Sequence, residues 1–191
     1  MRLPSFAMTS LLMAFFCLGA CDQSEDKIEQ KPEVNSSTIS EDENLDWIVD
    51  ELQIKWNNNK NYCIETLESM PEEAYNFIPA DSIKSFSEQA SHIITTMHWQ
   101  MAKLGFDNPP EFNNGSKAEL IKSYELLFDY LLSELEAMDG EALKETVGVF
   151  YGKSTKRRLF NLLDHHVAHH RGQMIVYLRL KGIEPPKYRG W

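Results

Sequence analysis

Apolar residues recur every three or four positions over most of the chain after Asn44, which is the spacing of one face of an α-helix. Four amphipathic stretches of this kind follow one another: from Asn44 to just before Pro71, Asp81 or Ser82 to Gly105, Ser116 to Gly140, and Ser154 or Thr155 to Gly182. The third opens with Ser116 and Glu119 at the spacing of a capping box, and Pro185-Pro186 prevents the fourth from continuing. The pattern predicts four helices.

The segment from Glu141 to Lys153 is ambiguous, because it fits a short helix to Val147 followed by a turn near Gly152. We find no convincing run of alternating apolar and polar residues, so we expect no strands. Amphipathic helices without strands bury their apolar faces against one another. The predicted fold class is therefore all-α, a four-helix bundle.

The first twenty residues have the layout of a secretory signal peptide. Met1-Arg2 is positively charged, an apolar run extends from Leu3 to Phe16, and small residues precede Cys21. A cysteine at this place resembles the bacterial lipobox, in which the thiol is acylated and becomes the new N-terminus. The alternatives are an ordinary signal peptide and a membrane-spanning helix, for which the apolar run is marginally short. We expect a lipid anchor on Cys21 and a folded part outside the cytoplasm, on the periplasmic side of the bacterial envelope.

Residues 22–43 are acidic and polar and contain no aromatic side chain. Such a segment buries too little apolar surface to offset the entropy lost on ordering. We therefore divide the chain into a signal peptide (1–20), a lipid-anchored flexible tether (21–43) and a folded bundle (44–191).

Charge argues against one class of function, and cysteine content limits the kinds of site the folded part can contain. The formal net charge is −10 and no basic stripe is present, which argues against nucleic-acid binding. Of the three cysteines, Cys17 and Cys21 lie in the N-terminal stretch, which leaves only Cys63 in the folded part. A disulfide framework and a cysteine-rich zinc site are therefore excluded there. Cys63 falls on the apolar face of its helix, so we expect a buried core thiol.

Four of the six histidines lie between Leu163 and Met174. Helical phase divides them into two pairs with a spacing of four residues. His166 and His170 share the apolar stripe of their helix, whereas His165 and His169 share a more polar stripe. Neutral imidazoles one turn apart on one helix face can bind the same divalent ion. We predict that His166 and His170 are metal ligands.

An open metal site in proteins commonly has three protein ligands, so a third is needed. The remaining histidines, His92 and His98, both lie on the second predicted helix. His98 is somewhat closer to the apolar face and His92 lies on the flank beside Trp99. Helical phase alone does not decide between them.

Two blocks of sequence resemble the DinB superfamily. They are Ser-Phe-Ser-Glu-Gln-Ala-Ser-His at 85–92 and His-Val-Ala-His-His-Arg-Gly-Gln at 166–173, and the similarity extends over about 45–191. The resemblance implies a four-helix bundle with a long crossover connection, in many relatives a homodimer. It also implies a divalent metal ion held by His92, His166 and His170. His98, His165 and His169 would then be surface groups or neighbours of the ligands, with His169 as a candidate proton shuttle.

The nature of the metal and the reaction remain open at this point. Zinc is our first expectation, and imidazole ligands alone do not distinguish it from nickel, iron or manganese. Some relatives are thiol transferases and others look like metal-dependent hydrolases, so one hypothesis is an enzyme that acts on a small molecule. A location outside the cytoplasm weakens the thiol version, because the usual thiol pools are cytoplasmic. The alternative is a non-catalytic metal-binding or stress-associated envelope protein.

Overall fold

Four long helices, two 3₁₀ turns and a short hairpin are the regular elements of the part of the chain that the structure, a computed structural model, describes: residues 44–149 and 151–190. The helices are α1 (Asp46–Ser69), α2 (Phe86–Leu104), α3 (Lys117–Glu136) and α4 (Lys156–Leu180). The predicted all-α bundle is confirmed. The proposed signal peptide, the lipid anchor at Cys21 and the tether all lie outside the described residues.

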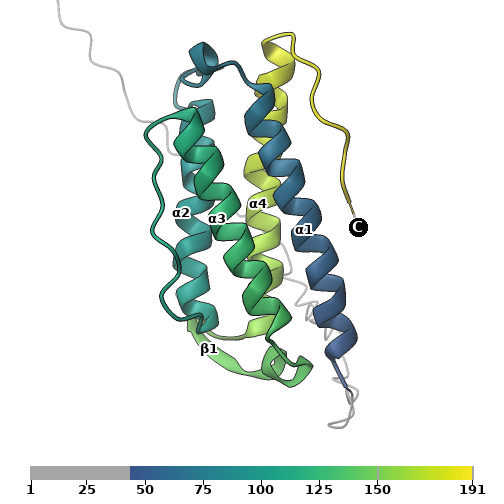
Figure 1. Ribbon diagram of the computed structural model, residues 1–191. Coiled ribbons are helices and arrows are strands. Elements are labelled where there is room, and N and C mark those ends of the chain that lie inside the picture. The colour runs from purple at the N-terminus through teal and green to yellow at the C-terminus, as the bar shows by residue number, and fades with distance from the viewer. Residues whose placement is uncertain (1–43, 150, 191) are drawn as a thin grey trace, which may run out of the picture. The chain divides into compact units, whose positions relative to one another are not determined.

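The helices run up, down, down and up in chain order (Figure 1). Residues 105–116, which connect α2 to α3, follow the length of the bundle and return the chain to its starting end (Figure 1). This is the expected long crossover connection. It places each helix against an antiparallel partner, because α1 packs mainly on α3 and α2 mainly on α4.

Large apolar side chains from all four helices meet in one core. Trp56 of α1 packs against Phe128 of α3 with ring centroids 6.1 Å apart, and Tyr124 stacks on the same ring. Met97 of α2 and Leu163 of α4 are fully buried in this core. Cys63 is buried as predicted, and burial raises the pKa of its thiol.

The second helix begins later than the sequence pattern indicated. Ser82 has a φ of 66°, a left-handed backbone conformation that does not start a helix. Ser85 is the N-cap instead: its side chain accepts a hydrogen bond from the Glu88 backbone N–H, and Glu88 accepts one from the Ser85 N–H. This is a complete capping box, four residues after the weaker candidate at Asp81.

The ambiguous segment after α3 contains strands, contrary to our expectation. Helix α3 ends at Glu136, and a 3₁₀ turn, η2 (Gly140–Lys144), follows. Strands β1 (Thr146–Val149) and β2 (Gly152–Thr155) then form an antiparallel hairpin in which Thr146 pairs with Thr155.

Among the described residues no helix has both the length and the apolar character needed to cross a membrane. A second 3₁₀ turn, η1 (Glu72–Ala74), follows α1.

Candidate metal centre

His92 lies on the side of α2 that borders α4, two helical turns after the Ser85 cap. Because the capping box fixes where α2 begins, it also fixes the angular position of every residue that follows in the helix. The neighbouring residue Ile93 is fully buried in the core, so His92 is held at the edge of that core. The side chain of His92 is half-buried.

His166 and His170 lie one turn apart on α4, with Val167 buried between them. Both imidazoles are half-buried, which agrees with their assignment to the inward stripe. His165 and His169 are exposed, as their more polar stripe predicted. The helical phase of α4 was therefore interpreted correctly.

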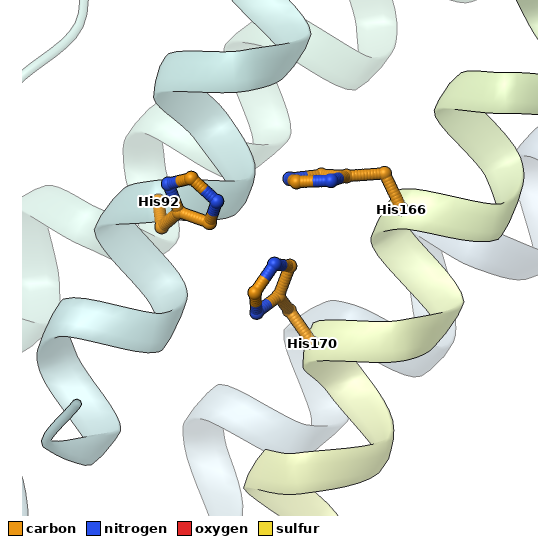
Figure 2. A group of neighbouring side chains, drawn as sticks. All are labelled: His92, His166 and His170. Carbon is orange, nitrogen blue, oxygen red and sulfur yellow. The ribbon is translucent and has the colours of Figure 1, made fainter. Parts of the chain in front are cut away.

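The three rings converge on one space between α2 and α4 (Figure 2). His92, His166 and His170 each offer one ring nitrogen, and these nitrogens lie within 4.8 Å of one another. The ring centroid of His92 is 4.9 Å from that of His166 and 4.5 Å from that of His170. The arrangement is suited to one divalent metal ion.

The electrostatics of the cluster keep the imidazoles neutral, the form that can donate a lone pair to a metal. Burial, followed by the charges of neighbouring histidines, lowers the pKa of His166 to about 4. The same causes, with a contribution from Lys84, lower the pKa of His170 to about 4. Burial and then Lys84 lower the pKa of His92.

One buried atom gives an independent indication that the cluster fits a metal ion. The Nε2 atom of His166 is inaccessible to solvent and has no hydrogen-bond partner. Buried polar atoms in proteins are nearly always satisfied, so an unsatisfied one calls for an explanation such as local strain, a water molecule or an ion. A divalent ion at the convergence of the three rings would supply that partner.

His98 is not part of the cluster. Its ring lies against Phe112 of the α2–α3 connection, with centroids 5.4 Å apart. The structure thus separates the two α2 histidines, which helical phase had left undecided: His92 borders α4, and His98 borders the crossover connection.

Gln89 is a contributor that sequence analysis missed. It lies one turn before His92 on α2, is 2% exposed, and its Oε1 lies 2.6 Å from His170 Nδ1. Its sequence signals are a polar residue near the apolar face of α2 and its place in the DinB-like block 85–92. Gln173, the last residue of the second sequence block, bonds to Gln89 and therefore links α4 to α2.

Comparison with known proteins identifies the family of this chain. The sequence pattern of the DinB family matches residues 44–190. The chain belongs to the DinB family. YjoA of Bacillus subtilis (strain 168), described as an uncharacterized protein, is 30% identical over 140 residues, which cover 69% of this chain and 90% of YjoA.

Solved structures of DinB-like proteins have the same fold. The crystal structure of YjoA from Bacillus subtilis has a TM-score of 0.62 at 26% identity, over 74% of this chain and 99% of YjoA. A DinB-like protein from Bacillus cereus ATCC 10987 has a TM-score of 0.63 at 20% identity, over 73% of this chain and 97% of that protein. The resemblance noted in the sequence is thereby confirmed at the level of family and fold.

Two further residues of the second DinB-like block, Arg171 and Gly172, have contrasting surroundings in this chain. Arg171 is buried, donates a hydrogen bond of 2.6 Å to Asn59 Oδ1 on α1, and lies over the Tyr62 ring. Gly172 is exposed, and a Cβ added there would have no neighbour within 4 Å. No close contact with another helix therefore requires glycine at this position.

Proposed function

We propose that this DinB-family protein is a lipoprotein of the bacterial envelope that binds one divalent metal ion through His92, His166 and His170. The observation that carries the metal site is the convergence of three ring nitrogens within 4.8 Å, in a cluster whose buried His166 Nε2 has no other partner. Zinc is the first candidate and nickel and iron are alternatives, because imidazole suits these metals; manganese, which favours oxygen ligands, is the weakest alternative.

We propose further that the site acts as a metal-dependent transferase or hydrolase on a small molecule. A bound divalent ion would supply Lewis acidity, which lowers the pKa of a coordinating water or thiol. The histidines would contribute three neutral ligands, so an ion with two positive charges would keep its full charge. Lys84 adds a further positive charge that acts on His170. This surplus of positive charge favours an anionic ligand, such as a thiolate, in the open position.

The metal assignment is tested by metal analysis of purified protein. We expect about one ion per chain in the wild type and in His165→Ala, and none in His166→Ala, which removes a ligand. His165→Ala is the matched control because its side chain is exposed on the same helix, one residue away. Stoichiometric metal in His166→Ala would refute the ligand set. Anomalous scattering at the absorption edges would identify the element.

The catalytic assignment is tested by turnover of metal-loaded protein on two panels: low-molecular-weight thiols with electrophiles, and small esters and amides. We expect turnover that a chelator abolishes and His166→Ala lacks. No turnover on either panel, together with intact metal binding, would favour the non-catalytic metal-binding or stress-associated envelope protein. Light scattering of the purified bundle tests the homodimer implied for many relatives.

The membrane anchor is tested by replacement of Cys21. Lipoprotein processing attaches acyl chains to this thiol, and each buried methylene contributes about 0.8 kcal/mol to membrane affinity. We expect Cys21→Ala to move the protein from the membrane to the soluble fraction, whereas Cys17→Ala should leave it at the membrane. Unchanged fractionation of Cys21→Ala would contradict the anchor.

A further inference from the structure

The buried side-chain amide of Gln89 is bonded on both sides. Its oxygen lies 2.6 Å from His170 Nδ1, and its nitrogen donates to Tyr177 Oη at 3.3 Å and to Gln173 Oε1. An amide nitrogen has two hydrogens and an amide oxygen accepts. Each of these contacts uses a different part of the group, so the Gln89 amide is fully satisfied in this orientation.

A backbone carbonyl fixes the direction of this chain of hydrogen bonds. The Tyr177 hydroxyl donates to the Lys84 carbonyl at 2.8 Å, and a carbonyl can only accept. The hydroxyl hydrogen is therefore committed, and Tyr177 Oη must accept its bond from the Gln89 nitrogen. The Gln89 oxygen consequently faces His170. Since that oxygen can only accept, the hydrogen between the two groups belongs to His170 Nδ1.

A second branch opposes a reversed Gln89 amide. Gln89 donates to Gln173 Oε1, and the Gln173 amide nitrogen lies 2.9 Å from His169 Nε2. If the Gln89 amide were turned over, its oxygen would face the oxygens of both Gln173 and Tyr177, neither of which has a hydrogen to offer in this arrangement. Reversal would make the Gln89 NH₂ group the donor to His170 Nδ1, and His170 would then carry its hydrogen on Nε2. The Gln89 amide on α2 is therefore held in one orientation by Tyr177 and Gln173 of α4.

We propose that Gln89 is a positioning residue that fixes His170 as the Nδ1–H tautomer, with Nε2 as the atom that binds the metal. The inference rests on the proposed metal site, and it adds which atom binds and which residue selects that atom. A histidine ligand whose other nitrogen donates to a fixed acceptor is held in one tautomer and one ring orientation, and loss of such an acceptor typically lowers metal affinity 10–100-fold.

The tautomer can be measured without any metal. Long-range ¹H–¹⁵N correlation spectra of the metal-free wild type near neutral pH should show His170 with a protonated Nδ1 and an unprotonated Nε2. Gln89→Met keeps the length of the side chain and removes the acceptor, so it should lose this preference. Tyr177→Phe removes the hydroxyl that fixes the Gln89 amide, and should reduce the preference to a smaller extent. An Nε2–H tautomer in the wild type would overturn the proposal.

Metal affinity gives a second measurement, by competition for zinc with a chromogenic chelator. We expect Gln89→Met to bind zinc about 10–100-fold more weakly than the wild type. The matched control is Gln100→Met, because Gln100 is 3% exposed on the same helix but lies about 16 Å further along its axis. Circular dichroism and thermal unfolding of both variants show whether each one folds.

The outcomes separate the two proposals. Equal zinc affinity of folded Gln89→Met and wild type would overturn the positioning role while the metal site stands. An equal loss in Gln89→Met and Gln100→Met would also overturn it, because the effect would then be one of general packing. A wild type with the Nδ1–H tautomer that binds no divalent metal would refute the metal site and leave the effect of Gln89 on His170 standing.

Discussion

The histidines of α4 have similar sequence surroundings but different environments in the fold. Helical phase was sufficient to separate the inward pair from His165 and His169, because one turn of helix fixes which side chains share a face. Phase could not choose between His92 and His98, because that choice depends on which neighbour covers each flank of α2. Gln89 escaped prediction for a related reason: its role depends on contacts with α4, which sequence spacing on α2 does not contain.

The lowered pKa values predict a pH dependence of stability for the metal-free protein. The pKa of His166 and of His170 is about 4 in the folded state, below the ordinary value near 6.5 expected in the unfolded chain. As the pH falls, the unfolded state therefore takes up protons first and is stabilised. These groups should lower the free energy of unfolding progressively between about pH 6.5 and pH 4, and contribute no further loss below that range.

Urea denaturation at pH 7, 6 and 5 in the presence of a chelator measures this effect. We expect His166→Gln to show a weaker pH dependence than the wild type, and His165→Gln to show the same one. A wild type that is equally stable at all three pH values, or a dependence that His166→Gln leaves unchanged, would contradict the assignment to the cluster.

At the scale of elements, the sequence pattern predicted the helices better than their ends and connections. Apolar residues in α1 and α4 repeat at helical spacing over several turns, and a repeat of that length rarely arises by chance. Both Ser82 and Ser85 can cap a helix, and only the backbone shows that Ser85 does so. The hairpin was missed because each strand has four residues, too few to display an alternating pattern.

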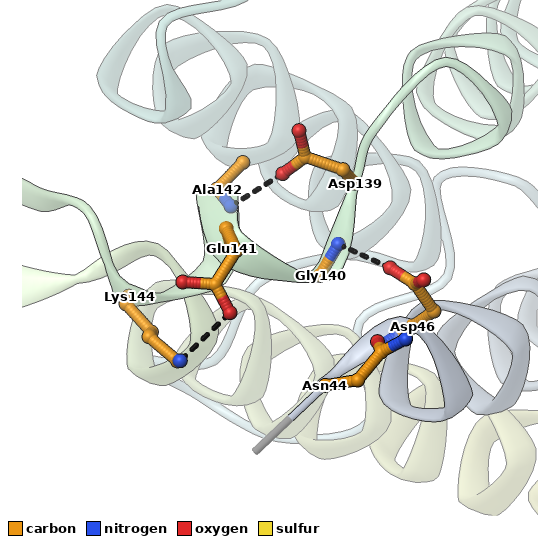
Figure 3. Close-up of polar contacts among 7 residues, drawn as sticks. All are labelled: Asn44, Asp46, Asp139, Gly140, Glu141, Ala142 and Lys144. Atoms are coloured by element: carbon orange, nitrogen blue, oxygen red, sulfur yellow. Dashed lines mark hydrogen bonds and ion pairs between the residues drawn. The ribbon is translucent and has the colours of Figure 1, made fainter. Parts of the chain in front are cut away.

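Two glycines show how differently one residue type can contribute to these elements. The Gly140 N–H donates to Asp46 Oδ1 at 2.8 Å, where η2 meets the start of α1 (Figure 3). A Cβ at Gly140 would lie 2.3 Å from the Leu45 backbone carbon, so only glycine fits there. Gly172 lies within α4, exposed, and has no such constraint.

We predict that Gly172→Ala stabilises the protein. Alanine at an exposed position in a helix restricts the unfolded chain and is favoured over glycine by about 0.5–1 kcal/mol. Urea denaturation should show this gain, whereas Gly140→Ala should be destabilised because backbone atoms would have to move. A loss of stability in Gly172→Ala would contradict this prediction, and would mean that glycine is needed here for a reason other than the space around it.

At the scale of the whole molecule, α4 connects the histidine cluster to the rest of the bundle through consecutive residues. His170 faces α2, whereas Arg171, the next residue, reaches Asn59 on α1. Asn59 also donates to Asp164 Oδ1 at 2.9 Å, and Asp164 forms an ion pair with Lys55. The long α2–α3 crossover makes this possible, because it leaves α4 in contact with both α1 and α2.

We predict that Asn59→Ala lowers the free energy of unfolding of the bundle and leaves the zinc affinity of the folded protein unchanged. The variant removes the side-chain oxygen that accepts from buried Arg171 and the nitrogen that donates to buried Asp164. Loss of a hydrogen bond to a charged group typically costs about 1.5–3 kcal/mol, and both charges lose a partner here. Asn57→Ala, at an exposed position on the same helix, is the matched control and should change stability little. Urea denaturation measures both.

The same variant separates the stability of the bundle from the geometry of the metal site. Asn59 touches α4 through Arg171 and Asp164, whereas the three histidines and Gln89 form their contacts between α4 and α2. At a temperature where Asn59→Ala remains folded, it should therefore bind zinc with the affinity of the wild type. An equally stable Asn59→Ala would show that Arg171 and Asp164 find other partners. A folded but metal-deficient Asn59→Ala would show that the α1–α4 contact helps to hold His166 and His170 in place.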